Sequence, residues 1–158
     1  MYRTILLAAA LQHWDRYSAH ALAAREVAGA MASGASHHLH VLSVYDHTFK
    51  APASGLPMEM VAQLREDDLR RTHQLMEHKV EEYIAPLKAV GLEVTTFLRA
   101  GDPRSVIVQT ADELKVDALV IGSHSKRNIL DIALGSTAKY LSHHVSCPVI
   151  FVSPAKQT

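Results

Sequence analysis

The sequence has little of what would point to several classes of protein. It contains one cysteine, Cys147, so no intrachain disulfide can form, and this fits a reducing cytoplasm. No apolar run approaches the ~20 residues of a membrane-spanning helix, and the N-terminal stretch lacks a basic region followed by a cleavage site. Sixteen Lys and Arg balance sixteen Asp and Glu, so no net charge attracts nucleic acid. We expect a cytoplasmic protein that binds neither membrane nor nucleic acid.

The common catalytic motifs are also missing. There is no Walker A loop, no Gly-x-Gly-x-x-Gly and no Gly-x-Ser-x-Gly nucleophile elbow. The eleven histidines include His38 and His40, which would share one face of a strand, but no third ligand has a spacing that completes a metal site. These absences favour binding over catalysis, and we expect no metal site.

Apolar runs and helical periodicities alternate along the chain, which predicts one α/β domain over residues 1–158. Strands separated by helices indicate a parallel sheet with helices on both faces, a three-layer doubly wound fold. The expected strands are residues 4–9, 37–45, 92–98, 118–121 and 149–152.

Capping residues predict where the helices begin and end. Asp15 is a suitable N-cap for the first helix and Gly34 a suitable stop. A long second helix is expected over residues 58–89, with Pro86 disturbing its last turn and Gly91 ending it. Asp102 and Pro103 are expected to start the third helix. The predicted inward face of the long helix is Leu69, Thr72, Met76, Val80, Tyr83 and Leu87.

The stretch from Asp117 to Pro154 carries the strongest functional signal. An apolar run ends in Gly122, and after a polar loop Gly135, Ser136 and Thr137 open an amphipathic segment. Glycine admits a ligand close to the backbone, and the unpaired N–H groups of a helix start favour an anion. This pattern predicts a phosphate site where strand, loop and helix meet.

The spacing of this stretch resembles the nucleotide motif of the universal stress protein family, Gly-x2-Gly-x9-Gly-Ser/Thr. Here the motif begins at Gly122 and closes at Gly135 and Ser136, and Ser125 replaces its second glycine. The segment 147–152 is similar to the family's last strand. Residues 5–7, 42–46 and 100–103 also resemble family segments, so the resemblance covers nearly the whole chain.

The resemblance implies a five-stranded parallel sheet in the order 3-2-1-4-5, with the ligand between strands one and four. It implies ATP or AMP as ligand, with Mg²⁺ accompanying ATP, and a homodimer formed through the edge strand 149–152. The expected nucleotide contacts are Ala9, Ala10, Val44, Gly122, Ser123, His124, Ser125, Lys126, Gly135, Ser136 and Thr137.

One contact of the family is missing from this sequence. Nucleotide-binding members carry an Asp after strand one that contacts the adenosine, and Ala10 stands at the corresponding position. One lost hydrogen bond costs about 1 kcal/mol, so we expect modest affinity. The leading interpretation is a module that binds an adenine nucleotide in stress response or signalling. The alternatives are a dimeric interaction protein with a vestigial pocket and a slow Mg²⁺-dependent nucleotide hydrolase.

Overall fold

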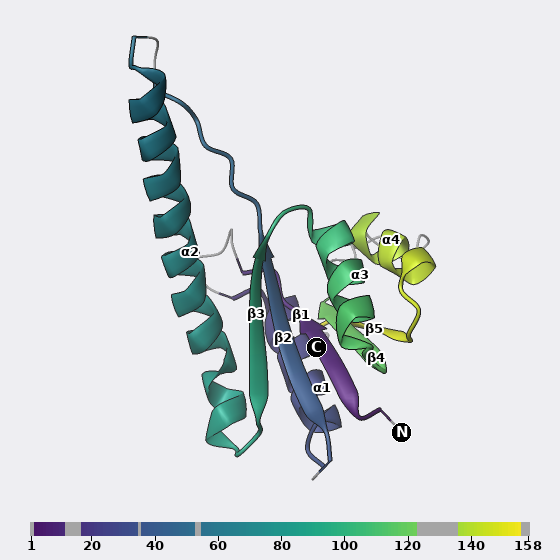
Figure 1. Ribbon diagram of the computed structural model, residues 1–158. Coiled ribbons are helices and arrows are strands. Elements are labelled where there is room, and N and C mark those ends of the chain that lie inside the picture. Colours follow the sequence, from purple (N-terminus) through teal and green to yellow (C-terminus); the bar gives the residue numbers. More distant parts are fainter. Residues whose placement is uncertain (1, 12–16, 35, 53–54, 123–135, 156–158) are drawn as a thin grey trace.

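Five parallel strands in the order β3-β2-β1-β4-β5 form one sheet (Figure 1). This order confirms the fold class and the strand order that the sequence predicts. The architecture comes from a computed structural model that describes residues 2–11, 17–34, 36–52, 55–122 and 136–155. The strands are β1 (Thr4–Ala8), β2 (His38–Tyr45), β3 (Val94–Ala100), β4 (Ala118–Gly122) and β5 (Val149–Val152).

β1 lies at the centre of the sheet and pairs with β2 on one side and β4 on the other. Ile5, Leu6 and Leu7 are fully buried, because helices cover both faces of a parallel sheet. The register places the last residue of β1, Ala8, beside Leu42 and Ile121. The strand order reverses between β1 and β4, which is where open α/β sheets bind ligands.

Two helices cover each face of the sheet (Figure 1). One buried cluster joins α1 and α2 to the sheet, and a second cluster joins α3 and α4 to the opposite face. The helices are α1 (Ala19–Met31), α2 (Met58–Ala89), α3 (Pro103–Leu114) and α4 (Ser136–His144). Within the described ranges, no helix is long and apolar enough to cross a membrane.

The first helix begins later than the sequence predicts. Its N-cap is Ser18, whose Oγ accepts a hydrogen bond from the Ala21 N–H at 3.1 Å. The predicted cap, Asp15, lies outside the described residues. Ser and Asp cap helices by the same chemistry, so the pattern alone did not separate them. The helix also ends at Met31, before the predicted stop at Gly34.

The long helix has the predicted bounds, but the prediction that Leu69 faces inward is wrong. Leu69 is 39% exposed, and the buried residues of α2 begin only at Met76. The helix continues through Pro86 to Ala89, so the expected disturbance does not shorten it. Gly91 follows with a positive φ of 85°, which explains the stop.

The third helix starts as predicted, with Pro103 in its first turn. Asp102 occupies the N-cap position, but its side chain makes no capping hydrogen bond and lies 3.7 Å from Arg104 instead. β3 runs two residues further than expected, to Ala100, because its pairing with β2 continues to the end of that strand at Tyr45.

Candidate functional site

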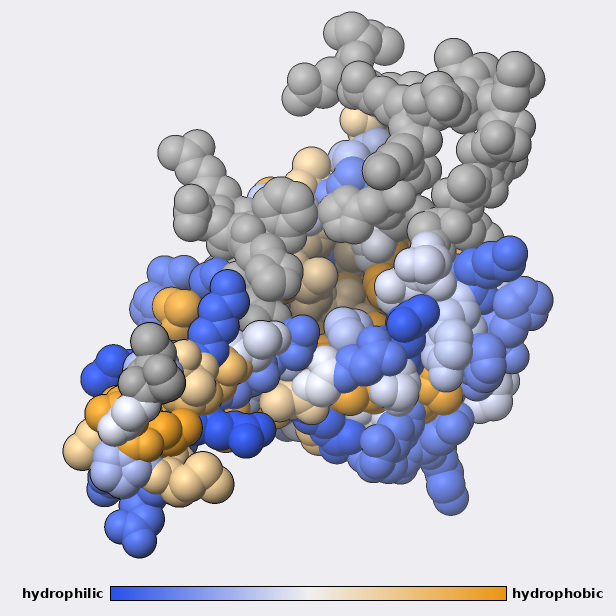
Figure 2. Space-filling model, turned by 90° about the horizontal axis from the view of Figure 1, so that it is seen from above, coloured by the Kyte–Doolittle hydropathy of each residue, from blue (hydrophilic) through white to orange (hydrophobic). Residues whose placement is uncertain are grey.

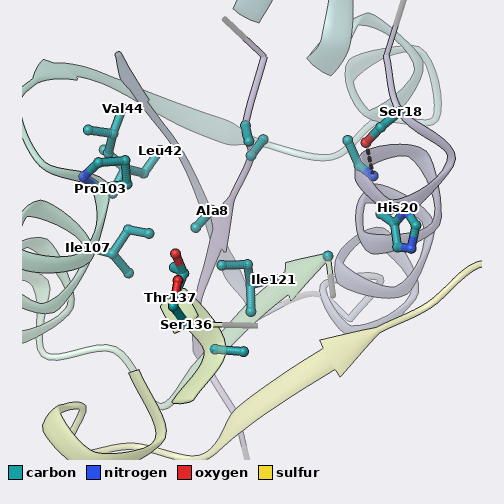
Figure 3. A pocket seen from close by; sticks show the side chains of 15 residues that line it. Ala8, Ser18, His20, Leu42, Val44, Pro103, Ile107, Ile121, Ser136 and Thr137 are labelled. Atoms are coloured by element: carbon teal, nitrogen blue, oxygen red, sulfur yellow. Dashed lines mark hydrogen bonds between the residues drawn. The ribbon is translucent and has the colours of Figure 1, made fainter. Parts of the chain in front are cut away.

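A cavity of about 360 Å³ opens where β1 and β4 end, at the reversal in strand order (Figure 3). Three strands and the first turns of α1, α3 and α4 form its walls. The lining residues are Ala8, Ala9, Ala10, Ser18, His20, Ala21, Leu42, Val44, Pro103, Ile107, Ile121, Gly122, Ser136, Thr137 and Ala138.

The structure brings together the predicted site residues that it describes. Residues from β1, β2, β4 and α4 meet in this cavity, although 128 positions of the sequence separate Ala9 from Thr137. The predicted residues that line it are Ala9, Ala10, Val44, Gly122, Ser136 and Thr137. Five further predicted residues lie outside the described part of the chain: Ser123, His124, Ser125, Lys126 and Gly135.

The sequence interpretation missed two groups of lining residues. Ser18 and His20 lie on the α1 side of the cavity, and Pro103 and Ile107 lie on the α3 side (Figure 3). The first group was missed because Asp15 was expected to cap α1, so Ser18 and His20 were not expected in its first turn, at the cavity. The sequence does hold a signal for the second group. Asp102 and Pro103 indicate a helix start directly after a strand, which places this helix start at the same edge of the sheet as the site.

Gly122 has a structural role that the motif did not indicate. A Cβ at this position would lie 2.9 Å from the carbonyl oxygen of His20 and 3.0 Å from its carbonyl carbon. Both are backbone atoms, so no rotamer change can relieve the contact. A glycine is therefore needed for the end of β4 to pack against the first turn of α1, and this packing closes one wall of the cavity.

The lining is largely apolar, with polar side chains only at helix starts. These are Ser18 and His20 of the α1 start and Ser136 and Thr137 of α4. The first turns of three helices thus border one cavity, and each brings the positive end of a helix dipole to it. No carboxylate occurs among the lining residues given above. Such a site suits a ligand with an anionic part and a flat apolar part.

The histidines on β2 form no metal site with their described neighbours. Among the residues that the structure describes, no group of three or more His, Cys, Asp or Glu side chains could hold a metal ion. His40 instead packs edge-on against the Phe97 ring, with the two centroids 5.6 Å apart. Burial lowers the pKa of His40, and the nearby His38 lowers it further, so the ring stays neutral at pH 7.

Solved structures of universal stress proteins have this fold. The structure of the hypothetical protein MJ0577 superimposes with a TM-score of 0.70 at 24% identity and covers 99% of both chains. A family member of Arabidopsis thaliana, solved with AMP bound, has a TM-score of 0.65 at 18% identity. That comparison covers 97% of this chain and 92% of the Arabidopsis chain.

Sequence comparison agrees with the fold. Universal stress protein MJ0531 of Methanocaldococcus jannaschii is 27% identical over 111 residues, which cover 68% of this chain and 61% of that protein. The chain spans 61%, 46% and 43% of the lengths of three curated relatives that it matches. The universal stress protein family itself matches residues 1–153. With this match over nearly its whole length, and with the sheet order and the cavity described above, the chain belongs to the universal stress protein family.

Proposed function

We propose that this protein binds an adenine nucleotide, AMP or ATP, in the cavity between β1 and β4. The observation that carries the proposal is the convergence of three helix starts on an otherwise apolar cavity at the reversal in strand order. The AMP-bound Arabidopsis structure supports this choice of ligand class, because it shares the fold. We further propose that the protein acts in the cytoplasm, in stress response or signalling, through its nucleotide-bound form rather than by catalysis.

The distribution of polar groups suggests how the nucleotide would lie. The phosphates would face Gly122 and the start of α4, where Ser136 and Thr137 add hydroxyl groups to the helix N–H groups. The base and ribose would lie toward Ala9, Ala10 and Val44, where the wall is apolar. Mg²⁺ would arrive with ATP, since Mg²⁺ commonly binds through substrate phosphates.

Isothermal titration calorimetry with AMP and with ATP plus Mg²⁺ tests the proposal. The parent should bind, and Thr137→Val should weaken binding about tenfold by removing one hydroxyl contact. Ala10→Asp should tighten binding, because it restores an acceptor beside the ribose. Ser142→Ala is the matched control on α4, since Ser142 is exposed and its Oγ donates to Lys139 within the same helix.

The replacement of an acidic residue by Ala10 supports one alternative function. In that case the cavity is vestigial and the protein acts by binding another protein. The two functions give different calorimetric results. Absence of binding heat with the parent, and again with Ala10→Asp, would reject the nucleotide proposal in favour of an interaction protein.

We also propose that the protein forms a homodimer through β5. This strand lies at the edge of the sheet and pairs only with β4 among the described strands. Three of its four residues, Val149, Ile150 and Phe151, are partly exposed, and an apolar edge invites pairing. Light scattering should report a dimer for the parent and a monomer for the Val149→Lys, Phe151→Lys variant. An unchanged mass for that variant would reject this interface.

A further inference from the structure

The first half of α2 extends past the sheet as an arm, which we define as residues 58–75 (Figure 1). These 18 residues span about 27 Å at 1.5 Å per residue. All buried residues of α2 lie from Met76 onward, so it is the second half that packs into the core. The arm also contacts the rest of the protein through the side chains of Asp68, which meets His47, and of His73, which meets Tyr45.

The arm carries apolar surface that nothing in the described structure covers. Six of the eight large apolar residues that are exposed among the described residues lie between Leu56 and Leu75. Leu75 is 55% exposed and Met58 is 87% exposed. Figure 2 shows apolar side chains gathered with charged ones on the part of the molecule that projects to the lower left. Most helical stability in proteins comes from the packing of an apolar face, so a packing partner would stabilise the arm.

Four arm residues form a seam along one side of the helix. Leu64, Asp68, Arg71 and Leu75 follow a spacing of four, three and four residues. At 100° per residue, this spacing keeps all four within a sector of about 60°. It is the spacing of the a and d positions at which helices pair in coiled coils. The seam thus has a leucine at each end and two opposite charges between them.

The seam is complementary to the same seam of a second copy that runs in the opposite direction. If the arm of a second copy runs antiparallel, Leu64 faces Leu75 of that copy and Asp68 faces its Arg71. Each of the four layers then holds a matched pair. A parallel arrangement would instead put Asp68 against Asp68 and Arg71 against Arg71, which is repulsive. Polar residues at a and d positions fix register and orientation in this way.

We propose that the α2 arm is an interface with a second copy of this chain, formed as an antiparallel helix pair along this seam. Both charged groups are accessible for it. The Asp68 side chain is 50% exposed and contacts His47 through Oδ2, which also holds the carboxylate in place. Arg71 is exposed. α2 packs against β3 and β2, on the side of the sheet away from β5, so the two interfaces do not overlap.

Cysteine cross-linking tests the antiparallel register directly. Leu64→Cys and Leu75→Cys are made separately, both with Cys147→Ser, and are oxidised alone and as a mixture. In the antiparallel pair, position 64 lies beside position 75 of the other copy, but two copies of position 64 lie about 16 Å apart. A disulfide needs Cα atoms within about 7 Å. The mixture should therefore form disulfide-linked dimers, and either protein alone should form few.

Charge exchange tests whether Asp68 and Arg71 specify the pairing, with the cross-link yield of the mixture as the readout. Arg71→Asp should lower the yield about tenfold, because two attractive pairs become repulsive. Adding Asp68→Arg should restore it. Arg70→Asp is the matched control, because Arg70 lies on the other side of the helix, 3.4 Å from Asp67. Circular dichroism of each variant shows whether the fold is intact.

Two results would overturn the proposal. One is a cross-link yield that is no higher in the mixture than in either protein alone. The other is a charge exchange that fails to restore the yield while Arg70→Asp lowers it as much as Arg71→Asp does.

Discussion

Replacing Tyr83 by Phe tests how the cavity wall is held to the core. Tyr83 of α2 is fully buried, and its hydroxyl donates a hydrogen bond to the carbonyl of Ala21 at 2.6 Å. Ala21 belongs to the first turn of α1 and lines the cavity. The Phe ring fills the same space, so the substitution removes the hydrogen bond and little else.

The size of the effect follows from burial. Removing one partner of a buried hydrogen bond costs about 1 to 3 kcal/mol, because the remaining group stays without water. For a chain of 158 residues, each kcal/mol lowers the melting temperature by roughly 2 to 4 °C. Tyr17→Phe is the matched control on the same α1–α2 interface. The Tyr17 hydroxyl donates a hydrogen bond to the Lys79 carbonyl at 2.9 Å but is only partly buried. Water can therefore bond to that carbonyl in Tyr17→Phe, so this variant should lose less stability.

The effect should also depend on pH. Burial raises the pKa of Tyr83, so the folded protein keeps the phenol proton where the unfolded chain loses it. The contribution of the buried Tyr83 phenol to the free energy of unfolding is complete below the pKa of about 10 that tyrosine has in the unfolded chain. It declines as the pH rises above that value. Urea unfolding at pH 8 and pH 10.5 should show that the parent and Tyr83→Phe differ less in their free energy of unfolding at the higher pH. If Tyr83→Phe lost no more stability than Tyr17→Phe, the reasoning would be refuted.

Three further predictions concern single contacts. Ser18→Ala should destabilise the protein by about 1 kcal/mol in urea unfolding, because the Ala21 N–H loses its cap, and an unchanged midpoint would contradict the capping role. Gly122→Ala should weaken both stability and nucleotide binding, because its Cβ would press on the His20 backbone, and an unchanged melting temperature together with an unchanged affinity would contradict this packing role. Asp117→Asn should lower stability at pH 7. The Asp117 carboxylate accepts hydrogen bonds from the Thr4 and Arg3 N–H groups, which lower its pKa, so this stabilisation is present above pH 4 and is lost as the pH falls through the lowered value. The difference between the unfolding curves of parent and variant should therefore be larger at pH 7 than at pH 3.

The sequence predicted the sheet well because buried parallel strands are continuous apolar runs. Ile5 to Leu7 and Ala118 to Val120 are buried on both faces, and such runs have few other interpretations. The reversal in strand order came from the family resemblance, since composition does not encode which strands pair. The site residues at strand ends followed from that order, and Ala9, Val44 and Gly122 do line one cavity.

Sequence reasoning failed where tertiary context decides the outcome. Leu69 has the periodicity of a core residue, but it lies in the half of α2 before Met76, where the helix has no buried residue, and it is 39% exposed. Ser18 and Asp15 have the same capping chemistry, so the sequence alone does not separate them, and Ser18 is the cap in the structure. The role of Gly122 in helix packing was also missed, because it depends on where the backbone of a distant helix passes.

The central position of β1 has a consequence for the order of folding. β1 pairs with β2, about 34 residues later, but its other neighbour, β4, begins at Ala118. The cavity needs that second pairing and also the start of α4 at Ser136. During synthesis, the ribosome must therefore release most of the chain before the site exists, while β1, β2 and β3 can already associate. A nucleotide that binds in the cavity needs the late contacts in place, so it would act on the last step of folding rather than on the first.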